Sequence, residues 1–162
     1  MILIGLGSSL PFCGSQPQEV VPAAIRAIGA MATLEKVSRL YASPAWPDPA
    51  DPAFVNAVIA VRSNLGPDRL LAGLHVIEAA FGRERSRRNA PRTIDLDLLA
   101  YGSLVQEGGA GKPTLPHPGL SSRDFVLAPL CDIDPDWLCP RLGKTARDLL
   151  AALPSRSATP IS

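Results

Sequence analysis

The chain is organised around the stretch GRERSRRNAPRTIDLDLLAY, which runs from Gly82 to Tyr101. In its second half apolar residues alternate with polar ones: Ile94, Leu96 and Leu98 against Thr93, Asp95 and Asp97. A period of two predicts a half-buried β-strand. On such a strand Asp95 and Asp97 point to the same face, with their Cα atoms roughly 6.5–7 Å apart. The stretch therefore predicts a strand that buries one face and presents two carboxylates on the other.

The first half of the stretch is basic, with arginines at Arg83, Arg85, Arg87, Arg88 and Arg92. Paired carboxylates can hold a hard cation, and Mg²⁺ suits oxygen ligands. Guanidinium groups bind phosphate oxygens through paired hydrogen bonds. Either half alone is more often a solvated strand face or a soluble loop. Their segregation within one short stretch favours the joint interpretation, a site for a polyphosphate and a metal.

The overall composition is that of a single globular domain. The chain has 162 residues, of which 46% are hydrophobic and 19% charged. The net charge is only +1, so the arginine cluster is local, and a broad basic surface for nucleic acid is not expected. Aromatic residues make up 5%, which argues against a platform of stacked bases. We therefore expect no nucleic-acid partner.

The cellular setting is indicated by what the sequence lacks. It contains no run of 18 apolar residues, so we expect no membrane span. Its start, MILIG, has no basic region and indicates a first strand, not a signal peptide. Cys13, Cys131 and Cys139 are odd in number and lack C-x-x-C spacing, which argues against a disulfide framework or a structural zinc site. We expect a cytoplasmic protein.

The order of predicted elements points to a fold. Strands are expected over 2–7, 34–42, 54–61 and the Asp95 stretch, with a further short strand at 104–105. Helices are expected over 18–31, from the Gly66 turn to Gly82, over 121–130 with serine as N-cap, and over 145–153. Pro22 should mark the first turn of its helix or a kink. The segment 43–53 contains four prolines and is a stiff loop that carries Trp46.

Strand–helix–strand twice over predicts an α+β fold with a ferredoxin-like split βαβ arrangement and a mainly antiparallel sheet. We expect one domain over 1–153, followed by a flexible tail over 154–162.

Motifs along nearly the whole chain carry a resemblance to a known family. They are Gly7-Ser8, Ser43-Pro44, Phe54-Val-Asn56-Ala, Gly82-Arg-Glu-Arg85, the run PRTIDLDLL from Pro91 to Leu99, Leu115-Pro-His-Pro118, Arg123 and FVLAPL from Phe125 to Leu130. The chain resembles the 6-hydroxymethyl-7,8-dihydropterin pyrophosphokinases of folate biosynthesis. The PRTIDLDLL run is the most specific of these motifs. Asn89 stands where many members carry tryptophan.

The resemblance implies transfer of pyrophosphate from ATP to the hydroxymethyl group of the pterin, with release of AMP. It implies two Mg²⁺ ions on Asp95 and Asp97, with Asp95 also near the attacking hydroxyl. Arg83 and Arg92 would be arginines that close on the phosphates. We also expect a monomer with ATP and the pterin as its partners.

The resemblance further implies two sets of binding residues. ATP contacts would come from His75, Glu78, Arg85, Arg92, Leu98, Lys112, Thr114, His117 and Arg123. The pterin would contact Ser43, Pro44, Ala45, Trp46, Phe54, Asn56, Asp95 and Phe125. Aromatic faces suit a flat heterocycle, and a carboxamide offers both a donor and an acceptor to its edge.

Two other functions remain open from the residues alone. One is a non-catalytic ferredoxin-like domain that binds a nucleotide or RNA through the arginine segment. The other is an ordinary kinase that releases ADP, because residue spacing does not separate attack at the β-phosphorus from attack at the γ-phosphorus. The choice of AMP as product rests on the resemblance.

Overall fold

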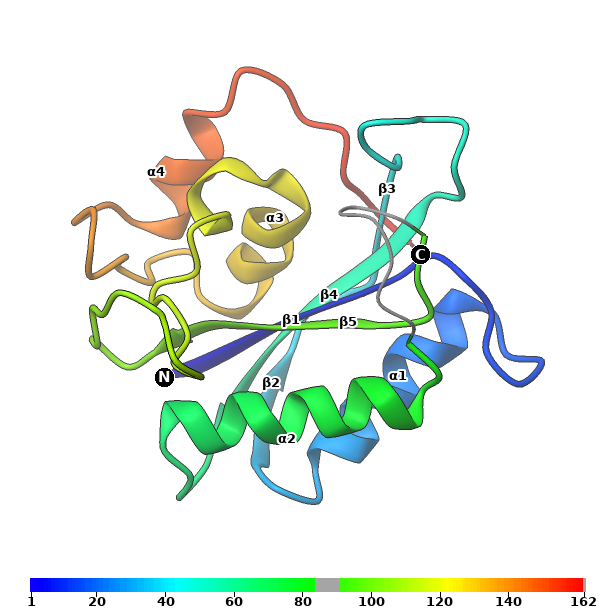
Figure 1. Cartoon of the computed structure of the whole chain (residues 1–162). Helices are drawn as coiled ribbons and strands as arrows, with labels where there is room; N and C mark the ends of the chain where they lie inside the picture. The colour runs from blue at the N-terminus through cyan, green and yellow to red at the C-terminus, as the bar shows by residue number, and fades with distance from the viewer. Residues whose placement is uncertain (84–90, 162) are drawn as a thin grey trace.

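The computed structural model describes residues 1–83 and 91–161, and its elements form one sheet with helices on both faces (Figure 1). The strands are β1 (Ile2–Ser8), β2 (Thr33–Val37), β3 (Tyr41–Ser43), β4 (Phe54–Arg62), β5 (Asp95–Tyr101) and β6 (Thr159–Pro160). The helices are α1 (Pro17–Ile28), α2 (Pro67–Ala80), α3 (Asp124–Ile133) and α4 (Ala146–Ala151), with a 3₁₀ turn at Leu120–Ser122.

The sheet is antiparallel at every described pairing, with strand order β5-β1-β4-β3-β6. β2 also pairs with β4, so β2 and β3 together occupy the place of one strand. With α1 after β1 and α2 after β4, the element order becomes strand–helix–strand twice over. The predicted ferredoxin-like α+β fold is confirmed.

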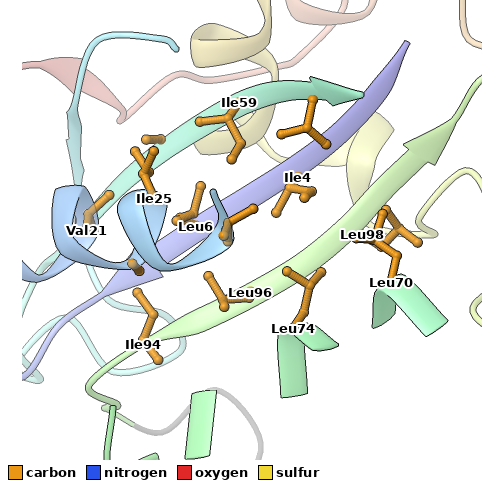
Figure 2. Packing of buried hydrophobic residues seen from close by; sticks show 14 of the residues in the cluster. Ile4, Leu6, Val21, Ile25, Ile59, Leu70, Leu74, Ile94, Leu96 and Leu98 are labelled. Atoms are coloured by element: carbon orange, nitrogen blue, oxygen red, sulfur yellow. The ribbon is translucent and has the colours of Figure 1, made fainter. Parts of the chain in front are cut away.

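One face of the sheet is buried beneath α1 and α2. Figure 2 shows side chains of β1, β4 and β5 meeting the two helices: Ile4, Leu6, Ile59, Leu96 and Leu98 against Val21, Ile25, Leu70 and Leu74. Because strand side chains alternate between faces, burying Leu96 and Leu98 here sends Asp95 and Asp97 to the other face. The apolar pattern of β5 thereby determines where its carboxylates lie.

The opposite face is covered only in part. Leu3, Val58 and Leu99 pack against Leu127 and Leu130 of α3. Beyond this contact, the first residues of β5, which include Asp95 and Asp97, and the first residues of β4 lie near the first residues of α3. This half of the face contains the cavity described below.

The predicted strand over 34–42 is wrong in its middle, where the structure has two strands separated by Ser38 to Leu40. Ser38 still pairs with Val58, since its N–H donates to the Val58 carbonyl at 2.9 Å. Arg39 then turns away, because its N–H and its guanidinium both donate to the Asp132 carboxylate at 2.9–3.1 Å. An N–H used in this way is not available to the ladder, so the strand breaks.

Several predicted boundaries differ for local reasons. Helix α1 begins at Pro17, where the Gln16 N–H donates to Glu19, and Pro22 lies within the helix, not in its first turn. Helix α3 begins at Asp124, because Arg123 has extended backbone angles and the preceding serines belong to the 3₁₀ turn. Residues 104–105 form no strand in the structure.

The last helix and the tail also depart from expectation. α4 covers Ala146–Ala151, with Thr145 as N-cap, and is shorter than predicted. The segment predicted as a flexible tail is instead held in place: Thr159 and Pro160 pair with β3, and the Ile161 N–H donates to the Leu40 carbonyl at 2.8 Å. No helix in the described ranges is long and apolar enough to cross a membrane.

Candidate active site

A cavity of about 460 Å³ lies on the half-open face of the sheet. Its walls come from β1, β4, β5, the loop after β3 and the start of α3, and its lining residues include Gly5, Gly7, Ser43, Pro44, Trp46, Phe54, Asn56, Asp95, Asp97, Ser122, Arg123, Asp124, Phe125 and Ser157. Gly7 has no side chain to fill the floor, and a Cβ there would lie 3.2 Å from Asn56 Oδ1. The glycine therefore keeps the space above the central strand open.

Asp95 and Asp97 both line this cavity, on one face of β5. They lie across from the two glycines of β1, since Gly7 pairs with Asp95 and Gly5 pairs with Asp97. The pairing places two carboxylates along one edge of an open space with no large side chain directly beside them on β1.

The Asp97 carboxyl has an unusual environment. Burial and the nearby charge of Asp95 raise its pKa from 3.8 to about 7, although Arg123 acts in the opposite direction. His117 Nε2 is 3.8 Å from Asp97 Oδ1. Burial and the Arg123 charge lower the His117 pKa, so the ring is neutral at pH 7, although Asp95 opposes this shift. Among the residues that the structure describes, Asp97 therefore forms no ion pair with an arginine or lysine, an arrangement that suits a carboxylate that binds a cation.

The neutral tautomer of His117 follows from its other nitrogen. Nδ1 accepts a hydrogen bond from the Gly119 N–H at 3.0 Å, so the ring proton is on Nε2, the atom that faces Asp97. The loop backbone is also anchored, because the His117 N–H donates to the Leu99 carbonyl at 2.8 Å. The ring thus presents a donor to the carboxylate edge of the cavity.

Asp95, in contrast, is well partnered. Arg83 Nη1 lies 2.8 Å from Asp95 Oδ1, and Arg92 Nη1 lies 3.5 Å from the same oxygen. Arg92 is held by its backbone, because its N–H donates to Ser9 Oγ at 3.1 Å and its carbonyl accepts from the Ser9 and Leu10 N–H groups. Two guanidinium groups are thereby held at the edge of the carboxylate pair.

Glu78 acts as a connection between elements. Its carboxylate is 3% exposed, contacts Arg83, and accepts the Leu96 N–H at 2.9 Å. It joins α2 to β5 and orients Arg83 toward Asp95. The structure therefore gives this predicted ATP residue partners within the protein.

A second group of side chains that line the cavity is aromatic and polar. Phe54, Asn56 and Phe125 line it together with Ser43, Pro44 and Trp46. Asn56 is buried, and its Nδ2 donates to Ser43 Oγ at 2.8 Å, which fixes the orientation of the carboxamide. The Arg123 guanidinium carbon lies 5.8 Å from the centre of the Phe125 ring. The arrangement offers ring faces and a fixed amide to a flat polar ligand.

The remaining predicted residues lie elsewhere. Ala45 is buried and does not line the cavity, and Leu98 is in the core on the opposite face of the sheet. His75 is exposed on α2, and Thr114 Oγ1 accepts the Gly108 N–H at 2.9 Å. Lys112 lines a separate cavity of about 530 Å³ near the start of α2. Arg85, Arg87, Arg88 and Asn89 lie outside the described residues.

Sequence reasoning missed several lining residues. Gly5 has no functional group that would mark it as a site residue. It lines the cavity because it pairs with Asp97 and has no side chain to fill the space beside that carboxylate. Asp124 stands between the predicted residues Arg123 and Phe125, so its position was a usable signal. Ser157 comes from a segment with no recognisable pattern, and only the folded chain brings it to the cavity.

Comparison with known proteins identifies relatives along most of the chain. The family model described as 7,8-dihydro-6-hydroxymethylpterin-pyrophosphokinase (HPPK) matches residues 3–135. A 2-amino-4-hydroxy-6-hydroxymethyldihydropteridine pyrophosphokinase from Pseudomonas aeruginosa is 38% identical over 155 residues, which cover 94% of this chain and 91% of the relative. A protein of the same name from Synechocystis is 40% identical over 129 residues, or 80% of this chain and 65% of the relative.

Solved structures agree in fold. The HPPK-DHPS of Plasmodium falciparum, as a triple mutant, matches with a TM-score of 0.71 at 12% identity, over 93% of this chain and 43% of that chain. The wild-type protein gives the same TM-score, over 40% of its chain. This chain thus spans less than half of those solved chains and about two thirds of the Synechocystis relative. At 12% identity the likeness supports the fold, while the sequence matches show that the chain belongs to the 7,8-dihydro-6-hydroxymethylpterin-pyrophosphokinase family.

Proposed function

We propose that the protein transfers pyrophosphate from ATP to the hydroxymethyl group of 6-hydroxymethyl-7,8-dihydropterin, giving the pterin diphosphate and AMP. The observation that carries the proposal is one cavity lined both by aromatic rings and by a carboxylate pair, with Arg83 and Arg92 beside Asp95. Relatives of high coverage are named for this activity.

The residues fit two Mg²⁺ ions as cofactors, although the described residues contain no group of three or more His, Cys, Asp or Glu placed to hold a metal. Asp95 and Asp97 supply carboxylate oxygens, and phosphate oxygens and water would complete the ligand sets. The raised pKa of Asp97 supports the fit, because a cation between the two carboxylates would relieve their repulsion. Bound Mg²⁺ would neutralise phosphate charge and hold the transferred group in line.

The reaction requires positioning more than covalent chemistry from the protein. The hydroxymethyl oxygen bonds to the β-phosphorus and releases its proton to water, while the bond from the β-phosphorus to the oxygen of the α-phosphate breaks and AMP leaves with that oxygen. Arg83 and Arg92 lie beside Asp95, where they would hold phosphate oxygens. Asp95 would lie nearest the attacking hydroxyl.

The pterin would occupy the part of the cavity that the aromatic residues line. Phe54 and Phe125 would contact its ring faces, and the fixed carboxamide of Asn56 would pair with its amide edge. Ser43, Pro44 and Trp46 would complete the wall. ATP contacts from Arg123 and His117 fit this placement, because both lie on the Asp97 side.

We further propose that the protein acts as a monomer in the cytoplasm without a nucleic-acid partner. The net charge of +1 argues against a nucleic-acid partner, and an odd number of cysteines without C-x-x-C spacing suits a reducing compartment.

The experiment is to incubate the protein with ATP, MgCl₂ and 6-hydroxymethyl-7,8-dihydropterin and to separate the nucleotides. AMP formed in proportion to pterin consumed supports the proposal, and replacement of MgCl₂ by a chelator should abolish it. ADP as product would indicate an ordinary kinase. Absence of pterin-dependent turnover, with retained ATP or RNA binding, would instead favour the non-catalytic alternative.

A further inference from the structure

The C-terminal segment from Ser157 to Ile161 lies alongside β3, next to the cavity. Figure 1 shows the chain after α4, in red, running past the top of α3 and ending with this segment at the side of β3. Its β6 residues pair with β3, Thr159 with Ala42 and Pro160 with Tyr41. The next residue of β3 is Ser43, which lines the cavity and accepts the hydrogen bond from Asn56. One end of the segment is therefore fixed to the Ser43 wall.

The other end is fixed to α3. The N–H groups of Ser157 and Ala158 both donate to Asp124 Oδ2, at 2.5 and 2.8 Å. Asp124 is 9% exposed and is the first residue of α3. Its neighbours Arg123 and Phe125 line the cavity, as do Asp124 and Ser157 themselves. A nearly buried carboxylate is thus compensated by two amides of the C-terminal segment.

The segment therefore joins the two walls between which a flat ring would lie. Without the segment, the Asp124 carboxylate would lose both N–H donors and remain a nearly buried charge with fewer hydrogen bonds at the start of α3. The first turn of α3 would have to shift to bring that carboxylate to water, and Phe125 would move with it. The edge of β3 that carries Ser43 would also lose its outer partner strand.

We propose that residues 157–161 form a brace that sets the spacing between Phe125 and the Ser43–Asn56 pair, and that Asp124 is the positioning residue through which the brace acts on pterin affinity. The effect on affinity rests on the proposed function; the brace itself does not. Asp124 does not need to touch the pterin for this role.

The test compares Asp124→Ala, Asp124→Asn, a chain ending at Arg156, and Asp124→Ala in that shortened chain. Asp124→Ala should raise the KM for the pterin about 10-fold, with the KM for ATP and kcat changed less than about 3-fold, because only ring positioning is lost. The shortened chain should show a similar rise, and the double variant no further rise, since both changes break one connection. Asp124→Asn should rescue most of the effect, because one amide oxygen can accept both N–H groups.

The control is Asp68→Ala, which removes an exposed acidic residue from the first turn of α2 and so matches the helix-dipole part of the Asp124 change. It should leave the KM for the pterin unchanged. Additive effects of Asp124→Ala and the truncation, or a KM for the pterin that neither change alters, would overturn the proposal.

Amide hydrogen exchange provides a readout that does not depend on catalysis. In Asp124→Ala and in the shortened chain, peptides covering 40–44 and 124–130 should exchange faster, while the α2 peptide should not. If the wild-type protein forms no AMP from pterin and ATP, the proposed function fails and the exchange result still decides on the brace. Unchanged exchange in both peptides would refute the brace even in an active enzyme.

Discussion

Replacing Asp97 by asparagine should make the protein more stable while it loses activity. Burial and the charge of Asp95 raise the pKa of the Asp97 carboxyl from 3.8 to about 7. The ionised carboxylate therefore destabilises the folded protein. Such a rise corresponds to at most about 4 kcal/mol, since each tenfold change in proton affinity is worth about 1.4 kcal/mol. One third of the side chain, 33%, is accessible. Solvent therefore screens part of this cost, and we expect Asp97→Asn to add about 1–2 kcal/mol to the free energy of unfolding at pH 8.

The gain should depend on pH in a defined direction. Because the folded state holds the Asp97 proton more tightly than the unfolded state, wild-type stability falls as pH rises from about 4 to about 7. Asparagine has no such ionisation. The difference between variant and wild type should therefore be absent below pH 4, grow up to pH 7 and remain constant above it.

The assay is thermal and urea unfolding followed by circular dichroism in metal-free buffer, from pH 4 to pH 8. At pH 8 the variant should melt about 3–6 °C above the wild type, the range expected for a chain of this size. Asp95→Asn is the matched control, because Asp95 contacts Arg83 at 2.8 Å and loses that ion pair. It should lower the melting temperature.

Two results would refute this reasoning. One is an Asp97→Asn variant no more stable than wild type at pH 8, which would mean that the carboxylate is better solvated or better partnered than its surroundings indicate. The other is equal stabilisation by Asp95→Asn, which would show a general effect of removing acidic charge, not a property of one site.

Three further predictions concern the arginines, the ring site and the core. Arg92→Ala should slow AMP formation more than 10-fold, about 1.4 kcal/mol or more; an unchanged rate would remove Arg92 from the mechanism. Asn56→Ala should raise the KM for the pterin about 10-fold and leave the KM for ATP nearly constant, because it removes the fixed carboxamide; equal rises in both would argue against pterin contact. Leu74→Ala, at a fully buried site beneath β5, should cost about 2–5 kcal/mol in urea unfolding, whereas Val76→Ala, at a side chain 69% exposed, should cost little; similar costs would contradict the packing of α2.

The sequence was most informative where a structural feature depends only on residues close together in the chain. Alternation in β5 depends only on the two-residue period of a strand, so it predicted both the buried leucines and the shared face of Asp95 and Asp97. The order of strands and helices predicted the ferredoxin-like arrangement in the same way. The break between β2 and β3 could not be found locally, because it depends on Asp132, which is distant in the chain and captures the Arg39 N–H.

The site shows the same division. Residue types alone indicated a metal and phosphates, because carboxylates and guanidinium groups each favour a ligand class, whereas the flat ring was implied only by the resemblance to the family. Residue types did not indicate that Asp95 has two arginine partners while Asp97 has a neutral histidine, since that difference depends on Arg83, Arg92 and His117 meeting β5 from three segments.

What the sequence by itself determined was therefore the alternating order of the main strands and helices, and the carboxylates and arginines that lie on or near β5. Only the tertiary structure decided that Glu78 orients Arg83 and that residues 157–161 meet Asp124. The physical reason is that patterns in sequence report which face of an element is buried. Hydrogen bonds between segments distant in the chain depend on the complete packing, and the segment predicted as a flexible tail was ordered by such bonds.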